Sequence, residues 1–157
     1  MEFKVGIVMG SVSDLPVMKG SFEMLDRMGV GYEKRVLSAH RTPAALEAWV
    51  KESQQRGVAV FIAAAGGAAH LAGVVAAFTT LPVIAVPIMT KALGGLDSLL
   101  AMVQMPSGIP VATVAIDGAK NAALLAVEML SISNPELREK VAAFRKDQAD
   151  KILETEI

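Results

Sequence analysis

Residues 57–90 contain no Asp, Glu, Lys or Arg, and this uncharged stretch constrains the fold more than any other feature of the sequence. It is longer than a membrane-spanning helix requires. However, a Gly-Gly pair and two prolines divide it into shorter runs, and much of its apolar character comes from alanine, which drives membrane insertion weakly. We therefore expect no membrane span. We interpret the stretch as strands buried on both faces of a sheet, with further surface covered by other copies of the chain.

The composition limits the class of protein. A length of 157 residues with 53% hydrophobic residues predicts a single domain spanning 1–157. Fifteen basic against 16 acidic residues give a net charge of −1, so no overall positive field is available to bind nucleic acid. The absence of cysteine excludes disulfides and Cys-type zinc sites and is typical of a reducing compartment, so we expect a cytoplasmic protein. The segment 1–10 is too short an apolar run for a signal peptide and predicts a first strand.

Short apolar runs alternate with amphipathic or small-residue segments along most of the chain. This alternation, with short connections, favours a parallel sheet with helices on both faces. We therefore predict a three-layer flavodoxin-like (Rossmann-like) α/β sandwich with a five-stranded parallel sheet. The predicted strands are 3–9, 32–37, 58–65, 82–88 and 111–116, and the predicted helices are 18–28, 43–56, 68–78, 96–102 and 119–130.

Residues 134–157 follow this repeat as an extra amphipathic helix. Asn134 and Pro135 are typical of a helix cap and a first-turn proline. The helix could dock on its own domain or on a neighbouring subunit, and the sequence leaves both open. One face carries Leu137, Val141, Phe144, Gln148 and Ile152.

Three polar or glycine-rich loops follow the first three predicted strands. In an open parallel sheet, ligands bind beyond the carboxyl ends of the strands. These loops are 10–14 (GSVSD), 38–43 (SAHRTP) and 66–70 (GGAAH), and they include both histidines of the chain. We therefore expect one ligand site at this edge of the sheet.

The first loop places Ser11, Ser13 and Asp14 at the start of a helix, where free amides and the helix dipole favour an anion. This suits a phosphate, with Asp14 available for ribose hydroxyls. The alternative is that Ser13 or Asp14 is simply the helix cap.

The second loop carries Arg41, which can bind a phosphate through two donors, and His40, which can exchange a proton near neutral pH. The alternative is a helix cap made by Thr42 and Pro43 beside a surface His-Arg pair.

The third loop contains Gly66 and Gly67, which let the backbone approach a ligand closely. Alternatively, small residues here only allow close packing of strand and helix. Three such loops at one edge together favour a site for a small phosphorylated ligand.

Other chemistries lack their usual patterns. The Walker, GxGxxG, GxSxG and HExxH motifs are absent, so the sequence does not indicate ATP hydrolysis, dinucleotide binding, serine hydrolysis or zinc proteolysis. A phosphoacceptor receiver domain would have an aspartate at the end of its third strand, where this chain has alanines and a glycine. The two histidines and scattered carboxylates show no metal-ligand spacing, so we expect no metal.

Five segments of the chain together match one family pattern: GSVSD at 10–14, SAHRTP at 38–43, AGGAAHLAG at 65–73, LDSLLAMVQMPSGIPVATVAI at 96–116 and KNAALLA at 120–126. With these segments the chain resembles the class I PurE family, the N5-carboxyaminoimidazole ribonucleotide mutases of de novo purine biosynthesis. The sister class, which carboxylates aminoimidazole ribonucleotide directly with CO2, typically has SAHKT and AGRSNALSG where this chain has SAHRT and AGGAAHLAG.

The resemblance implies an isomerase that moves a carboxylate from the exocyclic N5 to ring carbon C4 without ATP, metal or organic cofactor, in a homo-octamer with a flavodoxin-like core. It implies that His40 is the acid/base. Phosphate and ribose would be held by four polar residues of the first two loops, and the base and its carboxylate by Ser11 and the third loop, with His70 and Leu71 as pocket walls. The implied substrate-binding residues are Ser11, Ser13, Asp14, Ser38, Arg41, Gly66, Gly67, Ala68, His70 and Leu71.

The chain departs from the family pattern at two places. Ala72 stands where the family usually has proline, and Asp117 with Gly118 replaces a longer glycine-rich connection. Three alternatives remain from the sequence: a direct aminoimidazole ribonucleotide carboxylase, a non-catalytic nucleotide-monophosphate-binding module, and a flavin-binding electron carrier.

Overall fold

The computed structural model describes residues 4–155, so Phe3, where we expected the first strand to begin, and 156–157, at the end of the predicted last helix, lie outside the described residues. The strands are β1 (Val5–Met9), β2 (Tyr32–Val36), β3 (Val60–Gly66), β4 (Val83–Ile88) and β5 (Ala112–Thr113). A 3-10 helix, η1 (Val12–Asp14), leads into α1 (Leu15–Met28). The other helices are α2 (Pro43–Gln55), α3 (Leu71–Phe78), α4 (Leu96–Val103), α5 (Ala119–Ser131) and α6 (Pro135–Leu153).

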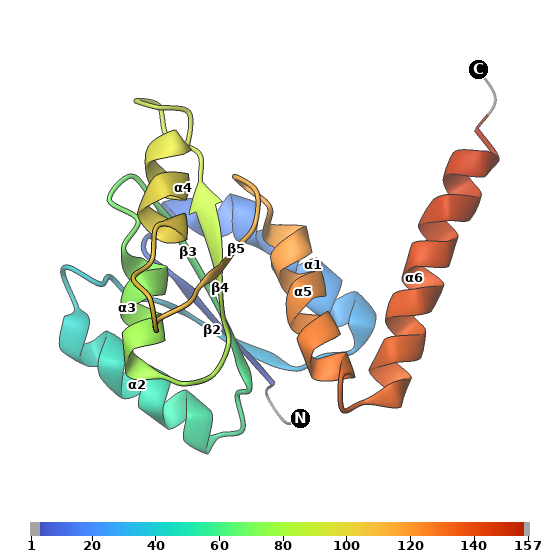
Figure 1. The fold of residues 1–157 in the computed structure, drawn as a ribbon, viewed down its shortest axis with the longest axis horizontal. Helices are drawn as coiled ribbons and strands as arrows, with labels where there is room; N and C mark the ends of the chain where they lie inside the picture. Colours follow the sequence, from blue (N-terminus) through green and yellow to red (C-terminus); the bar gives the residue numbers. More distant parts are fainter. Residues whose placement is uncertain (1–3, 156–157) are drawn as a thin grey trace.

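The strands form one parallel sheet in the order β2-β1-β3-β4-β5. The connection from β2 to β3 passes over β1. Strand β1 therefore lies between β2 and β3, with Val5 opposite both Tyr32 and Val60. Helices α1 and α5 cover one face, and α2, α3 and α4 cover the other (Figure 1). The predicted flavodoxin-like sandwich is confirmed, since this is its strand order.

Both faces of the central strands are buried. Ile7 and Ile62 pack into the apolar cluster under α1 and α5, whereas the next residue of β1, Val8, and the preceding residue of β3, Phe61, pack into the cluster under α2 and α3. Side chains alternate between the two faces of a strand, so a strand covered on both sides must be apolar throughout. This explains why residues 57–90 lack charges.

Within the sandwich, β5 and α3 fall short of their predicted lengths by the most. β5 has two residues, because the next amide of β4 on that side would come from Pro87, which has no N–H to donate. α3 begins at Leu71 instead of Ala68, because Ala69 N–H bonds to the Gly67 carbonyl and His70 N–H to the Ala68 carbonyl, a tight local path that is not helical.

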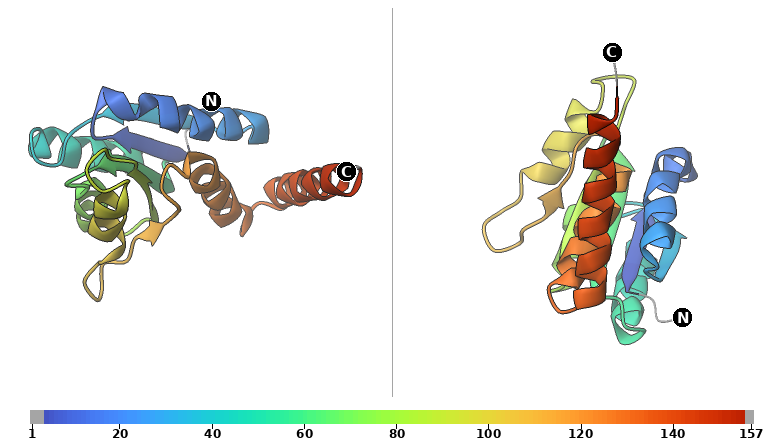
Figure 2. Two further views of the ribbon diagram at one scale, coloured as in Figure 1. Left: turned by 90° about the horizontal axis from the view of Figure 1, so that it is seen from above. Right: turned by 90° about the vertical axis from the view of Figure 1, so that its right-hand side faces the viewer.

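The C-terminal helix α6 packs on its own chain through its first half. Leu137 and Val141 are buried in the cluster under α1 and α5, and Lys140 Nζ donates to the Met28 carbonyl at 3.2 Å. The second half stands clear of the sheet (Figure 2), and Ile152 is 74% exposed. Across residues 4–155, no helix combines the length and the apolar character needed to cross a membrane.

The edge strand β2 is tied to the end of α2 by Glu33. Its carboxylate accepts hydrogen bonds from Arg56 Nε at 3.0 Å and Nη2 at 2.9 Å, and from the Ser53 hydroxyl. Burial alone would raise the pKa of Glu33, but the hydrogen bonds and charge of Arg56 and the hydrogen bond from Ser53 outweigh burial and hold the pKa below its ordinary value of 4.5.

This depressed pKa predicts a dependence of stability on pH. The unfolded chain binds the Glu33 proton more tightly, so the contribution is present above pH 4.5 and lost as pH falls through the folded-state pKa. We expect Glu33→Gln to lower the free energy of unfolding by about 1–2 kcal/mol at neutral pH, by chemical denaturation.

The deficit of Glu33→Gln should shrink as the pH is lowered to about 3. The control is Glu47→Gln, which removes an exposed pair with Lys51 and should cost less than about 0.5 kcal/mol. A Glu33→Gln deficit that does not change with pH would contradict the assignment.

Candidate functional site

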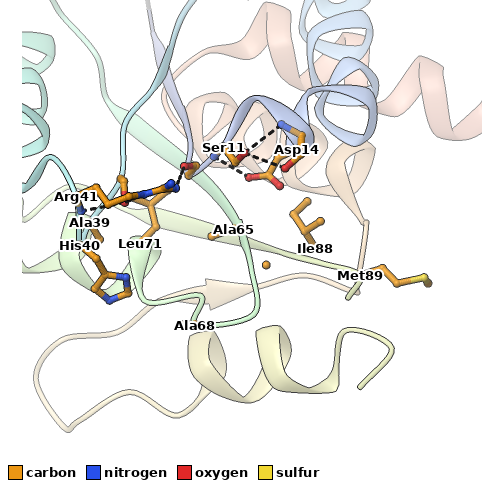
Figure 3. Close-up of a pocket in the computed structure, with 14 residues that line it drawn as sticks. Ser11, Asp14, Ala39, His40, Arg41, Ala65, Ala68, Leu71, Ile88 and Met89 are labelled. Atoms are coloured by element: carbon orange, nitrogen blue, oxygen red, sulfur yellow. Dashed lines mark hydrogen bonds between the residues drawn. The ribbon is translucent and has the colours of Figure 1, made fainter. Parts of the chain in front are cut away.

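The carboxyl ends of β1, β2, β3 and β4 open into a cavity of about 620 Å³. Small residues form much of its lining, because glycine and alanine stand at the ends of β1 and β3. Figure 3 shows side chains from the separate loops converging on this space. The lining residues are Gly10, Ser11, Ser13, Asp14, Ser38, Ala39, His40, Arg41, Ala65, Gly66, Ala68, Leu71, Ile88 and Met89.

The loop after β1 is closed by a capping box. Ser11 Oγ accepts from Ser13 N–H at 3.3 Å, and Asp14 Oδ2 accepts from Ser11 N–H at 3.1 Å, so both side chains satisfy amides at the start of η1. Asp14 is 5% exposed. Burial raises the pKa of its carboxyl, and hydrogen bonds with Ser11 and Ser13 oppose this. The side chain at the N-cap of η1 is therefore Ser11, not Ser13 or Asp14 as the alternative had it. Asp14 stands at the N-cap position of α1 but makes no side-chain cap hydrogen bond there.

The loop after β2 is held by Ser38 and Thr42. Thr42 Oγ1 accepts from Ser38 N–H at 2.9 Å and donates to the Ser38 carbonyl at 3.1 Å. Ser38 Oγ accepts from Arg41 N–H at 3.1 Å and from Arg41 Nε at 3.3 Å. Arg41 thus reaches toward the loop of Ser11 (Figure 3), and its Nη1 has no hydrogen-bond partner within residues 4–155. The guanidinium keeps donors for an anion.

The loop after β3 turns sharply at Gly67, whose φ is +69°. Gly67 N–H donates to Ser98 Oγ at 2.9 Å. At the end of this loop His70 meets the second loop, because His70 Nδ1 and His40 Nε2 lie 2.9 Å apart with the rings at 90°. One nitrogen must donate the shared proton and the other accept it.

The structure brings nine of the eleven predicted site residues to the cavity wall. The other two stand behind it: Gly67 bonds to Ser98, and His70 contacts His40. Sequence reasoning missed Ile88 and Met89, at the end of β4. The rule that ligands bind at the carboxyl ends of parallel strands applies equally to this strand and would have indicated them.

The site combines three chemical capacities. Arg41 offers a positive charge, the hydroxyls of Ser13 and Ser38 offer polar contacts for an anion, and His40 offers a group that transfers protons. Ala65, Leu71 and Ile88 add an apolar wall. Within residues 4–155, no three His, Cys, Asp or Glu side chains cluster as metal ligands would.

The conformation of Gly67 can be tested by substitution. A Cβ at Gly67 would meet no atom within 4 Å, so Gly67→Ala introduces backbone strain without a clash. We expect it to lower the free energy of unfolding by roughly 1–2 kcal/mol, measured by chemical denaturation. The neighbouring Gly66→Ala is the control, because its Cβ would make ordinary 3.5 Å contacts and its φ is not positive. Equal costs at the two positions would contradict the strained turn.

Comparison with known proteins identifies the family of the chain. Residues 4–151 match the family model described as AIR carboxylase. An N5-carboxyaminoimidazole ribonucleotide mutase of Pyrococcus abyssi is 62% identical over 144 residues, covering 92% of this chain and 83% of the relative. The mutase of Saccharolobus solfataricus is 54% identical over 154 residues, covering 98% of each.

The solved structures give the same result. The crystal structure of Treponema denticola PurE2-S38D superimposes with a TM-score of 0.90 at 32% identity, covering 98% of this chain and 96% of that chain. Family match, close relatives and fold agree over nearly the whole chain. The chain therefore belongs to the AIR carboxylase family and is one of its PurE proteins.

Proposed function

We propose that this chain is an isomerase that converts N5-carboxyaminoimidazole ribonucleotide into 4-carboxy-5-aminoimidazole ribonucleotide, a step of purine (IMP) biosynthesis. The observation that carries the proposal is the convergence of His40, Arg41 and Asp14 on one cavity. The relatives that share 53–62% of the sequence are named as mutases for this substrate, which supports the same reaction here.

One end of the cavity binds the ribose phosphate. Arg41 supplies a forked positive donor, Ser38 holds its guanidinium in place, and Ser13 adds a hydroxyl close to the start of α1. The carboxylate of Asp14, aligned by the Ser11 amide, accepts hydrogen bonds from ribose hydroxyls. These groups bind parts of the substrate that do not react, so they orient the base for the chemical step.

The base and its carboxylate lie between Ser11 and the loop of Gly66 to Ala68. His40 donates a proton to N5 as the N5–carboxylate bond breaks and CO2 leaves. Carbon C4 then attacks CO2 with its electron pair, and His40 takes the C4 proton, which restores the aromatic ring. His40 ends with the proton it began with, and the CO2 released from N5 is the CO2 bound at C4, so the steps balance without ATP or another co-reactant.

His70 orients the catalytic ring. Its bond to His40 Nε2 leaves Nδ1 of His40 without a partner within residues 4–155, and therefore available to the substrate. Leu71, Ala65 and Ile88 line the space in which CO2 is held, where an apolar wall excludes water that would compete for it.

The reaction and the role of His40 are tested together. Purified protein should form the C4-carboxylated product from N5-carboxyaminoimidazole ribonucleotide, followed by ultraviolet absorbance. Replacing His40 with Asn removes the acid/base while keeping a polar side chain of similar reach, so kcat should fall by roughly 100- to 10,000-fold while KM changes little.

Two results would contradict the proposed mutase reaction. Efficient turnover only of aminoimidazole ribonucleotide with bicarbonate would make the protein a direct carboxylase. Turnover of neither substrate, with ligand binding intact, would make it a nucleotide-monophosphate-binding module.

We further propose that residues 1–157 form one domain and that the protein is a cytoplasmic homo-octamer. One face of α4 supports self-association, because Leu96, Leu100 and Val103 recur at helical spacing and are 51%, 47% and 47% exposed. Met89 is exposed too and lines the cavity, so a neighbouring copy would also close the site. The free half of α6 is a second surface for a neighbour.

Assembly through α4 is tested by Leu100→Glu. A charge on this face costs desolvation and repels its counterpart in a self-complementary interface, so the variant should be smaller than wild type in light scattering. Leu100→Met, which keeps size and apolarity, should assemble normally. A wild-type mass other than eight chains would refute the octamer, and an unchanged mass for Leu100→Glu would remove α4 from the interface.

A further inference from the structure

Ser98, in the first turn of α4, links the site to a helix that contributes no residue to the cavity wall. Its side chain is 0% exposed. Its hydroxyl donates to the Ile88 carbonyl at 2.7 Å and accepts from Gly67 N–H at 2.9 Å. One hydroxyl therefore joins the end of β4 to the loop that follows β3.

The bond from Gly67 N–H to Ser98 Oγ anchors the loop that follows β3. The other hydrogen bonds at this turn, from Ala69 N–H to the Gly67 carbonyl and from His70 N–H to the Ala68 carbonyl, are local. Among residues 4–155, the bond to Ser98 is the one hydrogen bond that ties 67–69 to another element. Because Gly67 tolerates many backbone conformations, the turn depends on this contact more than a turn of bulkier residues would.

The anchor leaves the Ala68 amide available to a ligand. Gly67 N–H is used by Ser98, whereas Ala68 N–H bonds to no group within residues 4–155, and Ala68 lines the cavity. A loop held this way keeps the Ala68 amide in a constant place. Preorganised amides of this kind stabilise negative charge without reorganising during the reaction.

The same turn of α4 holds the next loop. Asp97 Oδ1 accepts from Thr90 Oγ1 at 2.7 Å, and Thr90 Oγ1 in turn accepts from the amide of Gly95 at 3.3 Å. The loop after β4 is thus braced against the helix that holds the loop after β3. A helix is a more rigid support for a site than a loop is.

We propose that Ser98 is a positioning residue for the carboxylate transfer. Its hydroxyl keeps the 66–68 backbone where the Ala68 amide meets the migrating carboxylate. This inference rests on the proposed function for the identity of the reacting group. The ribose phosphate is bound by the other two loops, so loss of Ser98 should affect the chemical step more than substrate binding.

The test compares Ser98→Ala with Ser21→Ala. Ser21 is also 0% exposed, and its hydroxyl donates to the Ala119 carbonyl at 2.6 Å. Neither residue lines the cavity, so Ser21 reports the general cost of losing a buried serine hydroxyl. For Ser98→Ala we expect kcat to fall roughly 10- to 100-fold with KM nearly unchanged. Ser21→Ala should keep the wild-type kcat and KM.

Hydrogen–deuterium exchange, read by mass spectrometry without substrate, supplies an independent measurement. The segment 66–70 should exchange faster in Ser98→Ala than in wild type, and should be unchanged in Ser21→Ala. Wild-type kinetics in Ser98→Ala would overturn the proposal, as would unchanged exchange of 66–70. An inactive wild type would refute the proposed function instead, and the exchange experiment would still decide whether Ser98 holds the loop.

Discussion

The burial of β3 on both faces is the constraint on which the rest of the structure depends. Its side chains alternate between two apolar clusters, one under α1 and α5 and the other under α2 and α3. A strand in this position has no room for a charged or catalytic side chain along its length. The chemistry must therefore lie where the strand ends, and β1 and β4, its two neighbours, end at the same edge because all three strands run parallel.

The small residues at that edge make the cavity possible. Gly10, Ala65 and Gly66 end two neighbouring strands, and together they contribute almost no side-chain volume. A Cβ at Gly10 would already lie 3.5 Å from the Cβ of Ala65, so larger residues here would begin to fill the space. The sequence offered two interpretations of these small residues, close packing of strand and helix or close approach of a ligand. Both hold, because tight packing at the strand ends leaves the space beyond them open.

Hydrogen bonds within the loops then direct the polar groups. Asp14 is nearly buried and occupied by the Ser11 amide, while Ser38 holds the guanidinium of Arg41 near the carbonyl of Gly10. Each side chain is oriented by a neighbour in its own loop or the next one. Ser11 and Asp14 form a capping box and also line the cavity, so capping and ligand binding do not exclude each other at these two residues.

Sequence reasoning predicted the long elements well and the short ones poorly. The central strands are continuous apolar runs and α1 has a strong apolar periodicity, so the positions of these elements follow from local pattern. The shortness of β5 depends on Pro87 in the neighbouring strand, and the late start of α3 depends on the turn at Gly67. The apolar pattern of the β5 and α3 segments does not contain either cause. The roles of individual site residues came from the resemblance to the PurE family. The position of the three loops at one edge of the sheet followed from the parallel arrangement of the strands alone.

The order of strands and helices, the sheet type, and the edge at which the three loops gather follow from the sequence, because hydrophobic period and the handedness of parallel crossovers act locally and leave few alternatives. The pairing of His40 with His70 and the anchoring of Gly67 by Ser98 appear only in the folded chain. These contacts join residues 30 and 31 positions apart. Distances of that kind are determined by how whole elements pack around β3, and no local preference of either residue encodes them.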